Sequence, residues 1–570
     1  MKTLSALNAL IVASLPHLVA SVDPHVNLTY TQYIGQPAAL DVTEWLGMRY
    51  AVPPIRRLRF SKPQDPATAW QVPELATKYG ARCIPTRDYN FDETDEKTWS
   101  EDCLFLNVFA PTNATTESKL PVFVYIPGGF FEINEPFTVN GAGLVAASNH
   151  SIIVVTFNYR VGPFGFLTGV DELRFEQPSG LTANNGFRDQ IKALEWVQRH
   201  ITEFGGNPDQ VVLGGSGSSL SWHLTANDGD NRGLFHAVAG ASPSWTSMIP
   251  HYRDLQNQYQ DFLRGMDCEF KGQPYGEPES ICIRLRKTWQ EIRRYSYLPR
   301  PGHSTGDTGT LWGPVIDDDL FKRTPFEAFE EGKFARVPAM FGDTTHSGRM
   351  LVPTVPFMDT IEKVDTFWKS RFPFLNTDDL KTLHQWYPSP HPNQNQTECG
   401  PGGCLGEQVS RAFGEMANLC PAIFINTHLQ ARGVKQSFNY RYDVADPTYS
   451  NIGLGVPYGM ENWGLFGPSN VPPMIFNSPT PQSYMPDEPN SLSVQAMQAY
   501  WTSFIRTFDP NTSRAPGSVE WIPYSDSHMR LLLGGGGQTS SEWISPSMLQ
   551  KCSFFLEKIY RFLGNTTTSG

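Results

Sequence analysis

The sequence predicts an α/β fold with a central, mostly parallel sheet flanked by helices, and three observations carry this prediction. Two short runs rich in β-branched and aromatic residues, 121–126 and 151–157, are typical of strands buried on both faces of a parallel sheet. Segment 189–204 has apolar residues at helical spacing. A third apolar run, 209–213, leads into a turn of glycines and serines. Strands that alternate with helices in this way indicate a sheet covered by helices.

Composition sets the size of the core and excludes one class of function. The chain has 570 residues, with 45 Lys+Arg against 57 Asp+Glu and a formal net charge of −12. A protein that binds nucleic acid through a basic face needs the opposite balance. Only 18% of the residues are charged and 12% are aromatic, so a large apolar core can form. We therefore expect a folded protein with a large core and no nucleic-acid partner.

The N-terminal residues have the pattern of a secretory signal peptide. Lys2 precedes an apolar stretch, and residues 18–20 form a cleavage site. That stretch is too short to span a bilayer, no later segment has about 18 uninterrupted apolar residues, and the C-terminal end lacks a hydrophobic tail. We expect residues 1–20 to be a signal peptide and residues 21–570 to form one domain, secreted or in the lumen of the secretory pathway, with no membrane span.

Secretion gives meaning to the Asn-x-Ser/Thr sequons, which are glycosylated only in chains that enter the secretory pathway. We expect some of the six sequon asparagines to carry glycans: Asn27, Asn113, Asn149, Asn395, Asn511 and Asn565.

The eight cysteines are expected to form disulfides, because a secreted chain folds in an oxidising compartment. Local pairing joins Cys83 to Cys103 and Cys268 to Cys282. The pairing of the other four stays open: Cys399, Cys404, Cys420 and Cys552. Two of these, at 399 and 404, have a spacing that zinc sites allow, but no second close pair of Cys or His follows, so we expect no metal.

The turn that follows residues 209–213 has the pattern of a nucleophile elbow. The apolar strand passes through the six glycines and serines of 214–219 into a helix. Strand, tight turn and helix in this order are typical of the α/β-hydrolase fold, where the turn Gly-x-Ser-x-Gly exposes a serine hydroxyl. The sequence therefore predicts an α/β-hydrolase fold.

Long motifs that follow one another along nearly the whole mature chain resemble those of a known family. They lie at 100–107, 158–167, 185–190, 204–208, 313–317, 501–511 and 521–524. They are similar to the type-B carboxylesterase/lipase family, which includes cholinesterases and fungal lipases, and the chain resembles a secreted, fungal-type member. The resemblance implies a cholinesterase-like α/β hydrolase that needs no cofactor and uses a triad with an oxyanion hole.

All three triad positions that the resemblance matches hold other residues. Gly217 stands at the nucleophile position, Ser347 at the acid position and Tyr458 at the histidine position. Glycine offers no nucleophile, and serine cannot carry the charge that stabilises an imidazolium. A phenol with a pKa of about 10 is a poor base at neutral pH. The resemblance thus implies the scaffold of the family without its usual hydrolytic groups.

Displaced residues are an alternative route to hydrolysis. Ser216 or Ser218 could act as a displaced nucleophile, and the nearest bases are His346 and His223. The position of His223 is more typical of a helix residue packed near the elbow. His346 is equally typical of a pocket wall and of a proton donor.

The oxyanion loop and the pocket walls are expected to remain. Segment 125–131 resembles the oxyanion loop, in which the backbone N–H groups of Gly129 and Phe130 face a developing negative charge, with the N–H of Ser218 as a third donor. Phe130 replaces a glycine, so the backbone angle that glycine favours is in question. The expected walls of an apolar gorge are aromatic: Phe131, Trp222, Trp245, Trp463 and Phe466.

Three functions fit these residues. We favour a non-hydrolytic step, such as cyclisation or dehydration, on a small apolar or carbonyl-bearing substrate of the secondary-metabolite type. Its available acids and bases are Tyr458, Glu461, Asp343 and His346. The alternatives are a carboxylic ester hydrolase that uses displaced residues and a secreted binding protein without activity. The sequence leaves the substrate, the reaction and the oligomeric state open.

Overall fold

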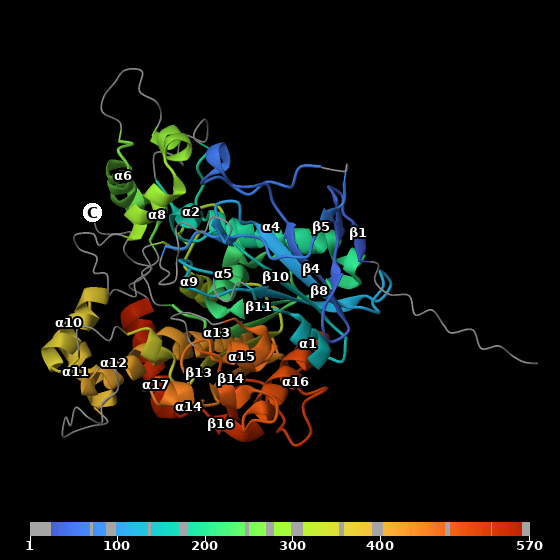
Figure 1. Cartoon of the computed structure of the whole chain (residues 1–570). Coiled ribbons are helices and arrows are strands. Elements are labelled where there is room, and N and C mark those ends of the chain that lie inside the picture. Colours follow the sequence, from blue (N-terminus) through green and yellow to red (C-terminus); the bar gives the residue numbers. More distant parts are fainter. Residues whose placement is uncertain are drawn as a thin grey trace, which may run out of the picture.

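Figure 1 shows the computed structural model of the chain, in which a large twisted sheet is packed between helices. The structure describes residues 24–68, 72–86, 98–134, 138–169, 180–245, 250–269, 279–297, 312–352, 358–389, 403–472, 479–525 and 527–560. The expected signal peptide, Cys399 and two of the sequon asparagines, Asn395 and Asn565, lie outside these residues.

One sheet of eleven strands forms the centre of the molecule, in the order β16-β15-β14-β13-β12-β11-β9-β10-β8-β4-β3. The strands from β10 to β15 in this order pair in parallel, and antiparallel strands close both edges. In chain order the strands are β3 (Gln36–Pro37), β4 (Val42–Arg49), β8 (Phe105–Pro111), β9 (Leu120–Ile126), β10 (Ile153–Phe157), β11 (Gly206–Ser216), β12 (Ala237–Ala241), β13 (Ala339–Thr344), β14 (Ser437–Asp443), β15 (Met529–Gly534) and β16 (Thr539–Trp543). The prediction of a mostly parallel sheet is confirmed.

Strand β9 shows why such apolar runs form central strands. Its side chains alternate between two cores: Val122, Val124 and Ile126 face one, and Phe123 and Tyr125 face the other. A strand that is covered on both faces buries successive side chains on opposite sides of the sheet, so it reads as a continuous apolar run.

Helices cover each face of the sheet (Figure 1). One core contains side chains of α4 (Asn185–His200), α5 (Gly217–Thr225) and α13 (Cys420–Ala431). The other contains side chains of α1 (Ala142–Ala147), α15 (Glu461–Phe466) and α16 (Ser491–Thr507). The helix predicted over 189–204 is therefore present, but it begins four residues earlier and ends in a 3-10 turn, Ile201–Phe204.

The remaining elements surround this framework. The helices are α2 (Gly162–Phe166), α6 (Gln256–Gly265), α7 (Glu279–Ile281), α8 (Trp289–Tyr297), α9 (Pro325–Glu331), α10 (Ile361–Arg371), α11 (Thr377–Trp386), α12 (Cys404–Gly414), α14 (Pro447–Ser450) and α17 (Pro546–Phe555). Two small sheets contain β1 (His25–Asn27), β2 (Gln32–Ile34) and β5 (Glu74–Leu75), and β6 (Arg82–Cys83) and β7 (Trp99–Ser100). Within the described ranges, no helix is both long and apolar enough to cross a membrane.

Disulfides link described cysteines both locally and at long range. Cys83 bonds Cys103, and Cys268 bonds Cys282, as local pairing predicts. A third disulfide, Cys420–Cys552, spans 132 residues and ties α13 to α17. Three disulfides fit a protein that folds in an oxidising compartment.

The described sequon asparagines differ in solvent exposure and in hydrogen bonding. Asn27, Asn113 and Asn149 are exposed. The amide of Asn511 is half-buried and donates to the carboxylate of Asp509 at 3.0 Å and to the carbonyl of Trp521 at 3.0 Å. A glycan on Asn511 would replace one of these donor hydrogens, so the geometry fits glycosylation poorly there.

Candidate functional site

The elbow between β11 and α5 leaves no room for a side chain at its apex. Strand β11 ends at Ser216, and α5 begins at Gly217. A Cβ on Gly217 would lie 2.6 Å from the backbone N of Pro243 and 2.8 Å from the carbonyl O of Ala241. Both contacts are to backbone atoms, which cannot swing away. A serine at 217 therefore fits only if the segment after β12 moves.

The two serines beside Gly217 have different surroundings. The hydroxyl of Ser218 donates to the carbonyl of Ser244 at 3.0 Å and accepts from its N–H at 2.9 Å. These two hydrogen bonds tie Ser218 to the segment after β12. Ser216 is half-buried and lines a cleft at the end of the sheet.

The two histidines that sequence reasoning offered as bases bond elsewhere. In the buried His223, Nε2 lies 2.9 Å from the side-chain oxygen of Gln190, and burial lowers the pKa of the imidazole to about 3. His346 Nδ1 accepts the N–H of Val456 at 3.1 Å, and burial lowers its pKa as well. Neither imidazole lines the cleft.

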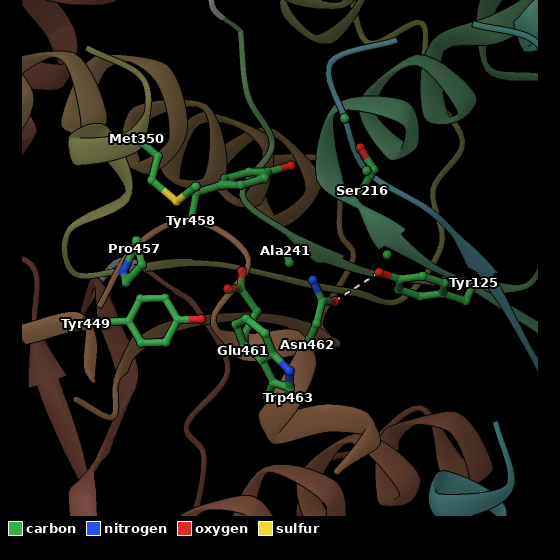
Figure 2. A pocket seen from close by; sticks show the side chains of 13 residues that line it. Tyr125, Ser216, Ala241, Met350, Tyr449, Pro457, Tyr458, Glu461, Asn462 and Trp463 are labelled. Atoms are coloured by element: carbon green, nitrogen blue, oxygen red, sulfur yellow. Dashed lines mark hydrogen bonds between the residues drawn. The ribbon is translucent and has the colours of Figure 1, made fainter. Parts of the chain in front are cut away.

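The cleft lies between the elbow and the start of α15 (Figure 2). Its cavity volume is about 40 Å³, which holds a few water molecules. Glycines, aromatic rings and one carboxyl form its lining: Tyr125, Gly128, Gly129, Gly215, Ser216, Ala241, Met350, Tyr449, Pro457, Tyr458, Glu461, Asn462 and Trp463. In Figure 2, Ser216 and Glu461 approach the cleft from opposite sides.

The loop that resembles the oxyanion hole keeps its turn despite the aromatic residues in it. Gly129 has a φ of +117°, and Phe130 and Phe131 have φ values of +56° and +63°. A bulky residue at positive φ is strained, and such strain persists only where the surrounding structure holds it. The ring of Phe130 stacks on the ring of Tyr458, with centroids 5.4 Å apart. Phe130 therefore retains the backbone angle that the sequence put in question.

Tyr458 and Glu461 place acidic groups in the cleft. Desolvation raises the pKa of the Tyr458 phenol, and the nearby carboxyls of Glu461 and Asp343 raise it further. Tyr458 is therefore a neutral hydrogen-bond donor at physiological pH. Desolvation, aided by the charge of Asp343, raises the pKa of Glu461 to about 8, because the N–H groups of Glu461 and Gly459 and the hydroxyl of Ser242 offset it only in part. Glu461 thus keeps its proton at neutral pH.

A second buried carboxyl lies behind Glu461. Desolvation raises the pKa of Asp343 to about 7, although hydrogen bonds from Ser347, Ser242 and the N–H of Thr344 oppose this rise. The hydroxyl of Ser347 donates to Asp343 Oδ2 at 2.9 Å. The residue at the matched acid position therefore bonds a carboxyl four positions earlier in the chain.

The aromatic residues expected as walls divide into two groups. Trp463 lines the cleft. The others pack against aromatic neighbours: Phe131 on Phe166, Trp222 on Phe321, Trp245 on Phe424 and Tyr560, and Phe466 on Tyr125.

Sequence reasoning missed several lining residues: Tyr125, Met350, Tyr449 and Asn462. Tyr125 opens the loop motif, and Asn462 follows Glu461 directly, so proximity to these motifs was an available signal. The hydroxyl of Tyr125 donates to the side-chain oxygen of Asn462 at 3.0 Å (Figure 2). Across the ranges that the structure describes, no group of three or more His, Cys, Asp or Glu side chains could hold a metal ion.

Comparisons with known proteins agree with this fold. Residues 23–543 match the profile described as "Carboxylesterase family". The chain is 28% identical to Secreted lipase 4 of Gibberella zeae over 517 residues, which cover 88% of this chain and 84% of that protein. It is 30% identical to Carboxylesterase 5A of Homo sapiens over 330 residues, 56% of this chain and 53% of that protein. The crystal structure of Aspergillus niger EstA matches with a TM-score of 0.82 and 32% identity, over 94% of this chain and 98% of EstA.

Proposed function

The chain belongs to the carboxylesterase family and has its α/β-hydrolase fold, and from this premise we propose that it binds a small carbonyl-bearing molecule and promotes a non-hydrolytic step, such as cyclisation or dehydration. The observation that carries the proposal is the carboxyl of Glu461, which is buried in a cleft whose described lining residues include no histidine, and whose raised pKa favours the protonated form. A positioned acid of this kind accelerates proton-dependent steps by about 10²–10⁴-fold.

Each group in the cleft suits one part of such a reaction. The loop amides at Gly129 and Phe130 and the phenol of Tyr458 supply neutral donors that polarise a carbonyl oxygen. Glu461 supplies the proton. The cleft is small and largely apolar, so a ligand that fills it would displace its few water molecules, and this favours rearrangement over hydrolysis.

The test compares metabolites of a strain that lacks the gene with those of strains that carry variants. Glu461→Gln keeps the shape and removes the acid, so we expect a precursor to accumulate as it does in the deletion strain. The matched control is Glu520→Gln at an exposed position, which should restore the product. Full restoration by Glu461→Gln would contradict the proposal.

Ester hydrolysis is a second candidate, because Ser216 presents a half-buried hydroxyl to the cleft and relatives bear lipase and carboxylesterase names. Covalent labelling of Ser216 by a fluorophosphonate probe, together with turnover of p-nitrophenyl butyrate, would establish it. A non-catalytic binding role is the third candidate, and the small cavity favours it. In that case deletion of the gene leaves the metabolite profile unchanged.

We also propose that the protein is secreted. The support is the lipase-like relative named as secreted and the three disulfides of the described residues. Detection of the mature chain, cleaved after about residue 20, in the culture medium tests this placement.

A further inference from the structure

Two neighbouring parallel strands bring a serine and a carboxyl together behind the cleft. Ala241 of β12 pairs with Gly342 of β13, so the next residues lie side by side: Ser242 directly after the end of β12, and Asp343 still within β13. The N–H of Ser242 donates to the carbonyl of Gly342 at 2.7 Å, which fixes this register. The first residue of α15, Glu461, meets them from the other side.

One hydroxyl links the two carboxyls. Ser242 Oγ lies 3.0 Å from Asp343 Oδ1 and 3.4 Å from Glu461 Oε1. Asp343 is held by two further donors, the hydroxyl of Ser347 at 2.9 Å and the N–H of Thr344 at 2.8 Å. All of the carboxyl oxygens except Glu461 Oε2 are therefore engaged.

Glu461 Oε2 differs from the other oxygens of the cluster. It is buried and has no hydrogen-bond partner of good geometry among the described residues, although the N–H groups of Glu461 and Gly459 lie near enough to the carboxyl to lower its pKa. The side chain of Glu461 lines the cleft. A buried polar atom left unpaired costs about 1–3 kcal/mol, and more if it is charged. An unpaired buried atom in a side chain that lines a cleft calls for an explanation, and a ligand atom that completes the hydrogen bonding is one.

We propose that Asp343 and Glu461 share protons as one pair through Ser242, and that Glu461 Oε2 presents a proton to an oxygen acceptor of the ligand, such as a carbonyl or ether oxygen. Here Glu461 touches the ligand, and Asp343 and Ser242 are positioning residues. This inference rests on the proposed function for the identity of the ligand, although the coupling of the two carboxyls does not depend on it.

Proton transfer through the pair balances without any further reactant. Glu461 Oε2 gives its proton to the ligand oxygen, Ser242 passes its hydroxyl proton to Glu461 Oε1, and Asp343 Oδ1 returns a proton to Ser242. The negative charge then resides on Asp343, where Ser347 and the N–H of Thr344 stabilise it. Return of the proton from the product restores the pair.

Other ionisable groups around the pair are cationic or phenolic. Arg530 of β15 is the nearby cation, and it donates to the carboxylate of Glu542 at 2.6 Å. Five phenols also act on the pair, and burial raises the pKa of each. They belong to Tyr125 of β9, Tyr440 and Tyr442 of β14, and Tyr458 and Tyr484 outside the strands. A titration near neutral pH in this cluster therefore belongs to the carboxyls.

Infrared difference spectroscopy of the purified full-length protein between pH 5 and 9 tests the pair directly, because a protonated carboxyl has its own C=O band. We expect the wild type to show such a band that disappears as the pH rises through about 7 to 8. Glu461→Gln should remove part of the band, and Asp343→Asn and Ser242→Ala should each shift the remaining transition by at least half a pH unit. Ser244→Ala is the matched control, because the hydroxyl of Ser244 is buried in the same loop without a partner.

The outcomes separate this inference from the proposed function. If Asp343→Asn and Ser242→Ala leave the Glu461 transition unmoved, the carboxyls are independent and the inference is wrong. If both variants shift it while Glu461→Gln still restores the metabolite in the complemented strain, the pair exists but the proposed function fails. Circular dichroism of each variant shows whether the fold is intact, and a chemically unfolded wild type supplies the unshifted reference.

Discussion

The two sides of the cleft are built in different ways. We call the loop Gly128–Phe131 and the turn Gly215–Ser218 the backbone half, and the side chains of Asp343, Tyr458 and Glu461 the side-chain half. The backbone half keeps the turn of the oxyanion loop, even with phenylalanines at positive φ. The side-chain half has a phenol, Tyr458, where the resemblance places an imidazole. Its two buried carboxyls, Asp343 and Glu461, lie away from the matched acid position, which holds Ser347.

This difference shows which features a sheet fixes and which it leaves free. The backbone half follows the carboxyl ends of β9 and β11, whose pairing is continuous from Val211 to Gly215, so its course is set by strand register. The side-chain half depends on residue types at strand and helix ends, where a substitution changes chemistry without moving a strand. A scaffold can therefore keep its hydrogen-bond donors while its acid–base groups are replaced.

Removal of the disulfide Cys420–Cys552 should have the largest effect on stability, and it should affect the two halves differently. It closes a loop of 132 residues, for which chain entropy gives about 5 kcal/mol. Tyr458 and Glu461 lie inside this loop, and the backbone half lies outside it. We expect hydrogen exchange of the Cys420→Ser, Cys552→Ser variant to speed up around 437–466 and to stay slow around 120–131.

The control for that experiment is Cys268→Ser with Cys282→Ser, which opens a loop of only 14 residues and should cost about 3 kcal/mol. Equal loosening of 437–466 and 120–131 in the first variant would show that the halves are one cooperative unit.

Gly217→Ser tests whether the backbone half accepts a nucleophile. The new Cβ meets the backbone of Ala241 and Pro243, so we expect a loss of about 1–3 kcal/mol in thermal unfolding. We expect no hydrolysis of p-nitrophenyl butyrate, because the described residues that line the cleft include no histidine. At Gly406, in α12, the nearest described atom to an added Cβ is 3.9 Å away, so Gly406→Ser is the control and should change stability by less than about 1 kcal/mol. Ester turnover by Gly217→Ser would refute our assignment of the base position.

Asp343→Asn should alter how stability depends on pH. The pKa of Asp343 is raised in the folded state, so its protonated form stabilises the fold at low pH, and this contribution is lost as the pH rises through about 7. As the pH rises, one carboxyl with a raised pKa in the folded state lowers the free energy of unfolding by at most about 1.4 kcal/mol per pH unit. In urea titrations we expect the variant to be less sensitive to pH than the wild type between pH 5 and 7. Parallel curves for the two proteins would mean that Asp343 is ionised throughout.

Tyr458→Phe should have the smallest effect on stability, because the stack on Phe130 needs only the ring. Loss of one hydrogen-bond donor to the ligand should lower the rate of product formation about tenfold. The free energy of unfolding should change by less than about 1 kcal/mol. Tyr458→Leu removes the aromatic stack as well, and should cost a further 0.5–1.5 kcal/mol or so. An unchanged rate in Tyr458→Phe would remove the phenol from the proposed chemistry.

The framework could be predicted because its signals are local. The runs that became β9 and β10, the helix α4 and the turn after β11 each show their pattern within about fifteen residues. The family motifs then placed the cleft beside the elbow. Local pairing of cysteines also succeeded for the two short loops.

The contacts inside the site could not be predicted because they join distant segments. Asp343 meets Ser242 through strand register, and Glu461 is brought to both by the approach of α15 to the sheet. The steric closure at Gly217 depends on the path of the segment after β12. Trp222, although one turn from the elbow, packs on Phe321 because its face of α5 points into the core.

The closed space at Gly217 also bears on how the chain could change over generations. Backbone atoms of Ala241 and Pro243 occupy the place that a side chain would need, so one codon change alone cannot give position 217 a serine that fits. A serine that fits there would require the segment after β12 to shift as well, and our proposal would further require a base at 458. At this position, a step toward serine chemistry is therefore a change in the path of the backbone and not only a change of side chain.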